Sequence, residues 1–430
     1  MKMFKHIATG AAMLSIAQMA NADVTFHITG STAFRAATVT AIQQAINGNS
    51  TPSPTAADNA TATSANNLLW TGSNSSLGNY TIKASFNGSG AGTQLVAGNL
   101  AIPFLSSTNT GWPTTIAAAP AYPGNTTDNV VPDAAMSDVF QATTGFLGSV
   151  KTIISGSNQA HTYTSLGDNK VAIVTFKPMA SKTFPQGTAS YVIDETGSFN
   201  VSSYSLTPQN FTATWGSGST LLSLYSGNHS DEGSIVYATG RNQDSGTRMT
   251  YLAETGYGVN NPVVQYFPTV SSSNTVSAVN EYAITTINGI STGANGNGGE
   301  SSGSAVRGYL AYPFNASLSN SGTNSAYFMT VLGTSDSSSV ATAAIELPYN
   351  GTYYSNTAVE EGSFTLWSYE HMFLVPGLST SNATGNAFAL SVKSYITGAA
   401  ESGLAKAGIP LGVMQVQREI DGGNITSVNY

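Results

Sequence analysis

The stretch Arg241-Asn242-Gln243-Asp244-Ser245-Gly246-Thr247-Arg248 is the most informative part of this chain for its fold. The apolar run before it, 234–238, predicts a strand, and residues 249–254 predict the first turns of a helix. A Ser-Gly-Thr turn between strand and helix directs helix amides that lack intrahelical partners toward one point. The arginine at its start adds a planar fork of donors suited to an oxyanion. The stretch therefore indicates either an anion site or a helix start capped by Asp244 or Ser245.

Composition places the chain among folded proteins with a neutral surface. Of its 430 residues, 8% are charged, 41% are hydrophobic and 10% are aromatic. The length allows two or three domains. Aromatic residues occur along the whole chain, which argues against disorder. The scarcity of charge and the abundance of glycine, serine, threonine and asparagine are more typical of a secreted protein than of a cytosolic one.

Residues 1–22 predict a signal peptide, with a buried core helix as the alternative. Lys2 and Lys5 give a basic start, and residues 7–19 are apolar or small but too few to span a bilayer. Ala20-Asn21-Ala22 then forms a small-residue cleavage site before Asp23. No later segment is apolar for long enough to cross a membrane. We therefore expect a mature protein, not membrane-spanning, in a periplasmic or extracellular location.

The charge balance narrows the class of ligand. Removal of residues 1–22, which contain two lysines and no acid, changes the formal charge from −8 to −10. A chain this acidic, without a basic patch, is not expected to bind nucleic acid. Local dipoles can still hold a small anion in an acidic protein. The chain has no cysteine, so disulfides, thiol chemistry and lipid attachment to a cysteine are excluded.

Two further turns rich in small residues separate a predicted strand from a predicted helix. The first, 29–35, lies between a strand at 23–28 and a helix at 36–46. The second, 88–93, follows a strand at 80–86 and precedes a helix that begins near Gln94. This alternation, with a buried strand at 170–176, predicts an α/β fold in which helices cover a sheet. The remaining expectations are loops at 47–75 and 288–304, helices at 206–215 and 387–404, and a strand at 307–312.

Four of these pieces, taken in chain order, resemble the phosphate-binding proteins of bacterial ABC transporters, which are type 2 periplasmic binding proteins. They are Thr29-Gly30-Ser31-Thr32-Ala33-Phe34, Tyr80 with Gly88-Ser89-Gly90-Ala91-Gly92, Ser137-Asp138, and Arg241 with Ser245-Gly246-Thr247. Residues 206–215 and 308–312 are similar to further segments of the family. The resemblance covers about residues 23–420.

The resemblance implies a two-lobed type 2 periplasmic-binding-protein fold of the α/β class, with a hinge and a ligand cleft. By analogy, residues 23–176 and 313–430 form the first lobe and residues 177–312 form the second. The chain would cross between the lobes near Phe176-Lys177-Pro178 and near 309–312. A ligand held in the cleft would favour closure, because it contacts both lobes only in the closed state.

The resemblance also implies the ligand-binding residues. Backbone amides of Thr32, Ala33 and Phe34 would face the anion. Ser89 would donate its hydroxyl, Arg241 would supply charge, and Ser245, Gly246 and Thr247 would close the site from the second lobe. Asp138 would accept the proton of hydrogen phosphate and so disfavour sulfate, since an acceptor facing a proton-free anion is unpaired and repelled. Two positions depart from the family: Gln243 replaces an aspartate, and Ala33 stands where many relatives have a hydroxyl.

Enzymatic chemistry has little support in the sequence. The histidines are isolated and no HExxH motif occurs, so neither a metal nor another cofactor is expected. His371 is interpreted as a satisfied, partly buried side chain rather than a catalytic one. The acidic pairs 231–232 and 360–361 are interpreted as solvated surface, and Ser245 lacks the surroundings of a nucleophile elbow.

The expected function is therefore a non-enzymatic one. The expected partners are phosphate or a related oxyanion and an ABC transporter permease. The alternatives are a secreted structural or adhesive protein on the same scaffold with the anion pocket lost, and a secreted phosphate-ester hydrolase.

Overall fold

The structure is a computed structural model. It describes residues 23–48, 52–108, 128–154, 157–167, 169–185, 189–193, 197–201, 204–283, 286–287, 290–291, 297–314, 325–340, 342–404 and 407–428. The signal peptide predicted at 1–22 and part of the tract at 288–304 lie outside these ranges. Within them, none of the helices combines the length and the apolar character that a membrane span requires.

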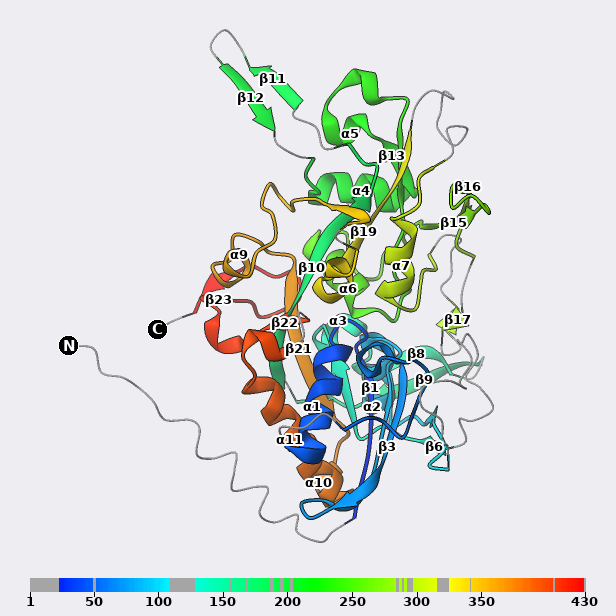
Figure 1. Ribbon diagram of the computed structural model, residues 1–430, viewed down its shortest axis with the longest axis vertical. Coiled ribbons are helices and arrows are strands. Elements are labelled where there is room, and N and C mark those ends of the chain that lie inside the picture. The colour runs from blue at the N-terminus through cyan, green and yellow to red at the C-terminus, as the bar shows by residue number, and fades with distance from the viewer. Residues whose placement is uncertain are drawn as a thin grey trace, which may run out of the picture.

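A mixed sheet of 12 strands runs the length of the molecule (Figure 1). Its strands follow in the spatial order β13 (Ser219–Leu221), β14 (Ile235–Ala238), β19 (Ala326–Gly333), β10 (Lys170–Ser181), β21 (Trp367–Leu374), β7 (Ala134–Ser137), β1 (Val24–Gly30), β4 (Gly78–Ser85), β3 (Asn67–Asn74) and β2 (Ala56–Ala57). Two further strands, β20 (Ala344–Glu346) and β22 (Gly408–Ile409), pair with β10.

β10 joins the two ends of this sheet. Lys170–Thr175 pair with β21, and Phe176–Ala180 pair with β19, both antiparallel. The change of partner falls at Phe176, where the sequence predicts a hinge. β19 lies in the stretch 313–430 that the sequence assigns to the first lobe, yet it pairs with β14 and with the second half of β10. The division of the chain into lobes stays a prediction.

The strand directions bring two sets of carboxyl ends face to face. β1 is parallel to β4 and to β7. β21 is antiparallel to both β7 and β10, so β10 runs in the same direction as β1. β19 is antiparallel to β10 and parallel to β14. β14 and β19 therefore run in the direction opposite to β1, and β19 begins beside the carboxyl end of β10. The carboxyl ends of β1, β4 and β7 therefore point toward those of β14 and β19.

Helices follow most of these carboxyl ends. α1 (Arg35–Asn47), α2 (Ser89–Gly98) and α3 (Gln141–Thr144) follow β1, β4 and β7. α6 (Gly246–Glu254) follows β14, and α8 (Thr334–Ser338) follows β19. α11 (Ala383–Thr397) packs against α1 and β1, and its Phe388 ring lies 5.3 Å from that of Phe26. Loops that precede helices at such an edge are the usual place for a ligand in an α/β protein.

The remaining elements are further helices and six small two-stranded sheets. The other helices are α4 (Pro208–Ser217), α5 (Ser223–Ser226), α7 (Gly303–Tyr309), α9 (Asn356–Glu360) and α10 (Leu378–Ser381). Six two-stranded sheets are β5 (Ile102–Phe104) with β6 (Asp128–Val130), β8 (Gly148–Ile154) with β9 (Ser157–Tyr163), β11 (Ala189–Ile193) with β12 (Gly197–Val201), β15 (Tyr266–Val270) with β16 (Val276–Glu281), β17 (Thr286–Ile287) with β18 (Ile290–Ser291), and β23 (Val416–Gln417) with β24 (Thr426–Ser427). The β11–β12 hairpin projects from one end of the molecule (Figure 1).

The mixed α/β class and most of the predicted elements are confirmed, and two expectations are wrong. The strand predicted at 307–312 is helix α7, whose start is capped by the Ser302 hydroxyl, an acceptor for the Ala305 amide at 3.4 Å. The loop predicted at 47–75 contains β2 and β3. β3 buries Leu68, Leu69 and Trp70, which form a strand because β4 supplies a partner from a later part of the chain.

Candidate functional site

The two facing sets of strands meet at one cluster of polar side chains. The backbone amide of Gly90, in the first turn of α2, donates to the carbonyl of Asp244 at 2.9 Å. A Cβ atom on Gly246, the first residue of α6, would lie 2.3 Å from Ser89 Oγ and 2.7 Å from Asp138 Oδ2. Only glycine fits at this contact. The turn that opens α6 therefore packs directly on the loops that follow β4 and β7.

Hydrogen bonds link three residues of the cluster, Ser31, Ser89 and Asp138. The Ser31 hydroxyl donates to the Asp138 carboxylate and accepts from the Phe34 amide at 3.0 Å. The Asp138 amide donates to Ser89 Oγ at 3.1 Å. Burial raises the pKa of Asp138, against the opposing effects of hydrogen bonds with Ser31 and Glu370 and of the nearby charge of Arg241. The Asp138 carboxyl group therefore binds a proton more readily than an exposed aspartate does.

Arg241 reaches across the contact to the loop after β1. Its Nη2 donates to Thr32 Oγ1 at 2.9 Å and to the Ser301 carbonyl at 2.9 Å, and its Nε donates to the Glu300 carbonyl at 3.1 Å. The residue is only 2% exposed. Burial lowers the pKa of Arg241, which is still charged because an arginine pKa lies far above neutral pH. Among the described residues, its hydrogen bonds all go to uncharged oxygens.

The departure at Gln243 and Asp244 has a structural explanation. Neither side chain pairs with Arg241, whose guanidinium is positioned instead by the carbonyls of Glu300 and Ser301. Those carbonyls are anchored because the Glu300 carboxylate accepts from the Tyr282 hydroxyl at 2.7 Å. Asp244 is buried, and burial raises its pKa to about 7. The loop therefore orients its arginine with backbone oxygens rather than with a carboxylate.

Ser245, Gly246 and Thr247 form the start of α6. Ser245 is the N-cap, and its hydroxyl accepts from the Arg248 amide at 3.3 Å. Gly246 and Thr247 are the first two helical residues and are buried. Behind them, Arg248 Nη1 donates to the Arg241 carbonyl at 3.2 Å. The capped helix start and the converging polar cluster are thus both present in one turn.

The predicted site residues differ in how they take part in this cluster. The structure brings together Thr32, Ser89, Asp138, Arg241 and Gly246. Ser245 and Thr247 flank this contact. Phe34 gives its amide to Ser31 and buries its ring, and Ala33 is buried with its methyl group 3.4 Å from the position of a Cβ on Gly333.

Two acceptor groups were missed by the sequence interpretation. Ser31, which belongs to the quoted motif, bonds Asp138 directly. Glu370, in β21, is fully buried, and its carboxyl group interacts with that of Asp138. Burial first, and the charge of Asp138 second, raise the pKa of Glu370 well above its ordinary value. The sequence did contain a signal for Glu370, because an acidic residue is unusual within an aromatic run such as 364–375.

No group of three or more histidine, aspartate or glutamate side chains in the described ranges is arranged to hold a metal ion. The chemical capacity of the cluster lies in one buried guanidinium, two serine hydroxyls, the first amides of α6 and one carboxyl group. Such a set can surround a small oxyanion, with donors on several sides and one acceptor for a proton.

The fold and the cluster together define a class: a mixed α/β protein whose two sets of strands direct their carboxyl ends at one polar, arginine-containing site. No family model matches the sequence, and no curated protein matches it.

The structure is similar to solved structures of phosphate-binding proteins. One is a possible phosphate binding protein from Planctomyces limnophilus, 11% identical, covering 91% of this chain and 95% of that chain, with a TM-score of 0.39. A putative phosphate ABC transporter substrate-binding protein with bound phosphate, from Clostridium perfringens, is 10% identical, covers 90% of this chain and all of that chain, and has a TM-score of 0.41. An ABC-type phosphate transport receptor from Vibrio cholerae is 12% identical, covers 86% of this chain and 93% of that chain, and has a TM-score of 0.39.

Proposed function

We propose that this protein is a solute-binding protein that captures phosphate, or a tetrahedral oxyanion like it, between two lobes. In this proposal the chain crosses between lobes at Phe176-Lys177-Pro178 and near 309–312. Residues 23–176 and most of 313–430 form one lobe. Residues 177–312 form the other, and β19 joins it through its pairing with β14.

The observation that carries the proposal is the direct contact between Gly246 and the pair Ser89 and Asp138, beside the bond from Arg241 to Thr32. Residues from four separate parts of the sequence meet there. Each is a donor, an acceptor or a glycine that permits close approach. We propose that an oxyanion replaces these direct contacts when it enters from an opened cleft.

Arg241 supplies the attraction in this mechanism. Charge-assisted hydrogen bonds contribute about 1.5–3 kcal/mol each, more than bonds between neutral groups. The carbonyls of Glu300 and Ser301 keep the guanidinium oriented, so little rotamer entropy is lost on binding. The amides at the start of α6 add donors and the positive end of the helix dipole.

Asp138 supplies selectivity. When ionised it accepts the proton of hydrogen phosphate, whereas sulfate at neutral pH has no proton to give and is repelled. Because burial raises the pKa of Asp138, this discrimination is lost as the pH falls through that pKa and the carboxyl group becomes protonated. Sulfate should then compete better at acid pH.

The wider biological role forms part of the same proposal. The predicted signal peptide and the phosphate-binding neighbours support a secreted or periplasmic protein that delivers its ligand to an ABC transporter permease for uptake. No covalent step is required, since capture and release need only opening and closing of the cleft.

The test is calorimetric titration of phosphate-stripped mature protein with phosphate, sulfate, molybdate and arsenate at two pH values. We expect phosphate binding that Arg241→Ala abolishes. Lys182→Ala, which removes an exposed positive charge from the end of β10, is the matched control and should bind normally. Folded protein that gives no heat with any of these anions would overturn the proposal.

A second candidate function is a secreted structural or adhesive role with the anion pocket lost. One observation favours it: the polar groups of the cluster already satisfy one another, Ser31 with Asp138 and Arg241 with Thr32. Absence of oxyanion binding by wild-type protein is the outcome that would support this alternative.

A further inference from the structure

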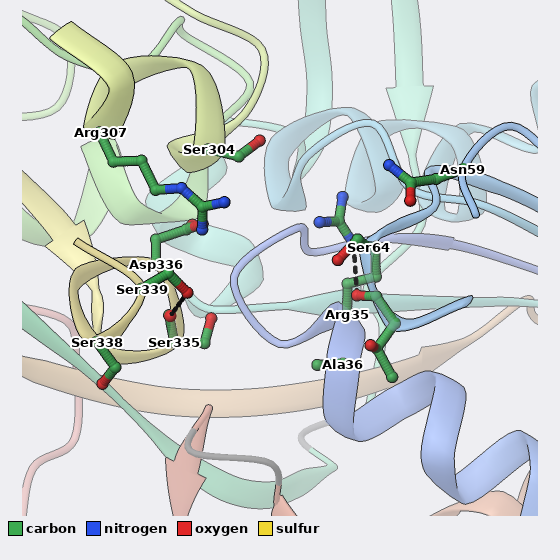
Figure 2. A pocket seen from close by; sticks show the side chains of 11 residues that line it. Arg35, Ala36, Asn59, Ser64, Ser304, Arg307, Ser335, Asp336, Ser338 and Ser339 are labelled. Atoms are coloured by element: carbon green, nitrogen blue, oxygen red, sulfur yellow. Dashed lines mark hydrogen bonds and ion pairs between the residues drawn. The ribbon is translucent and has the colours of Figure 1, made fainter. Parts of the chain in front are cut away.

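A polar cavity of about 410 Å³ lies at the start of α1, directly after Thr32, Ala33 and Phe34 in the sequence (Figure 2). One wall comes from the start of α1 and the segment 59–64, and the other comes from α7, α8 and Ser339. Arg35 and Arg307 lie on opposite sides of it, as Figure 2 shows. None of the nine predicted phosphate-site residues lines this cavity.

The chemistry of the cavity is that of a polyhydroxylated anion. Its lining consists mainly of hydroxyl and amide side chains, with Ala36 as its one aliphatic residue. Two guanidinium groups and one carboxylate, that of Asp336, line it, which leaves one positive charge in excess. Its volume falls in the range of about 300–1,000 Å³ that is typical of small organic ligands and is larger than a free oxyanion requires.

Arg35 is positioned by the protein and keeps donors for a ligand. Its Nε donates to the Thr63 carbonyl at 3.3 Å, and its Nη1 donates to Asn66 Oδ1. Within the described residues its Nη2 makes no hydrogen bond. Burial is the main cause that lowers the pKa of Arg35; the charges of Asp336 and Asp58 oppose this, and those of Arg241 and Arg307 add to it to a smaller extent.

Arg307 faces Arg35 from α7. Its Nη1 donates to Asp336 Oδ1 at 3.2 Å, which fixes the guanidinium at the edge of the cavity while leaving it partly exposed. An arginine held by one carboxylate can still present its other amino group to a phosphate. The opposed pair can therefore hold one anionic group between them, with hydroxyl donors and acceptors on either side.

We propose that this cavity is a second binding site, which takes a phosphorylated sugar or a similar phosphorylated polyol. The phosphate group would lie between Arg35 and Arg307, and the hydroxyls of the ligand would bond Asn59, Ser64 and Ser304. The cavity lies between the two lobes of the proposed function but shares no lining residue with the Arg241 cluster, so this second site stands even if free phosphate does not bind to the cluster.

The test is calorimetric titration of the mature protein with glucose 6-phosphate, glucose and inorganic phosphate. We expect saturable binding of glucose 6-phosphate and none of glucose, because glucose lacks the anionic group. Binding of both sugars with equal affinity would overturn the proposal, as would failure of glucose 6-phosphate to bind.

The first variant is Ser304→Asp. Ser304 is an exposed residue in the first turn of α7, where an acidic side chain is compatible with the helix dipole, so the protein should fold. The added negative charge lies in the cavity and should weaken glucose 6-phosphate binding by about tenfold or more. Thr357→Asp makes the same charge change in the first turn of α9, outside the cavity, and should bind normally.

The second variant is Arg307→Gln, which should weaken glucose 6-phosphate binding by about tenfold to a hundredfold, as expected for loss of a charge-assisted contact. Arg241→Ala distinguishes the two sites. Glucose 6-phosphate binding that survives Arg241→Ala supports the proposal. Binding that is lost with Arg241→Ala but unchanged by Ser304→Asp would place the ester in the cluster and overturn it.

Discussion

Two buried arginines of this protein have different surroundings. Arg418 Nη1 donates to Glu254 Oε2 at 2.7 Å, its Nη2 donates to the Thr365 carbonyl at 2.8 Å, and its guanidinium lies 4.1 Å from the centre of the Trp367 ring. Arg241 makes its hydrogen bonds to the uncharged oxygens of Thr32, Glu300 and Ser301.

The difference separates a structural arginine, Arg418, from the arginine that we propose binds the ligand, Arg241. The charge of Arg418 is balanced by a carboxylate in contact with it, so its contribution is to hold the C-terminal segment on α6. The charge of Arg241 has no carboxylate within hydrogen-bond distance among the described residues, and it lies where two parts of the molecule meet. An anion can add to Arg241 without displacing an ion pair.

The largest expected effect is on stability at Arg418. Arg418→Met leaves the Glu254 carboxylate, whose side chain is only 9% exposed, without its arginine and should lower the free energy of unfolding by about 3–5 kcal/mol. Arg241→Met should lower it by less, because no buried carboxylate loses an ion pair. Urea unfolding of phosphate-stripped protein measures both, and equal losses would contradict the distinction between the two arginines.

The next prediction concerns how the stability of the Arg241 turn depends on pH. Asp244, in the Arg241 turn, has a folded pKa of about 7, above the ordinary unfolded value of about 3.9. Its contribution to the free energy of unfolding is greatest below about pH 4 and is lost as the pH rises to about 7, roughly 4 kcal/mol in all at about 1.4 kcal/mol per pKa unit.

Asp244→Asn should therefore reduce the loss of stability between about pH 4 and pH 7. Asp421, whose pKa burial also raises to about 7, is present in both proteins, so the difference between the two unfolding profiles isolates Asp244. Identical profiles would show that Asp244 is ionised and acts as the counter-ion of Arg241.

The smallest effect is on selectivity. Asp138→Asn should bring the phosphate and sulfate affinities closer by about tenfold at pH 7, because an amide can donate to a proton-free anion. Titration of both anions against wild type and variant measures the ratio. An unchanged ratio would exclude Asp138 as the group that distinguishes them.

The α/β class was predictable from local patterns. Runs such as Val171-Ala172-Ile173-Val174 are apolar without alternation because neighbouring elements bury both faces of the strand. Glycine-containing turns at Gly30, Gly88 and Gly246 marked the strand-to-helix connections. At Gly246 the requirement for glycine comes from close approach of Ser89 and Asp138, which the sequence does not show.

The site was predictable only in part. The quoted motifs contain Thr32, Ser89, Asp138 and Arg241, because each lies in a recognisable turn. The carbonyls of Glu300 and Ser301 that orient Arg241 could not be predicted, since any residue can supply a backbone oxygen. Arg307 was placed in a strand rather than on α7, so the second cavity had no basis in the sequence.

The change of pairing partner along β10 has a consequence for folding. Phe176 pairs with Gly333, and Ile173 pairs with both Tyr369 and Ile409, so the middle of the sheet is assembled from residues distant in the chain. Such contacts close large loops before they gain any stabilisation, which slows folding. The N-terminal strands β1, β3 and β4 can pair early in synthesis, but the central strands must wait for nearly the whole chain. We therefore expect the joint between the two ends of the sheet to be the last part of this protein to form.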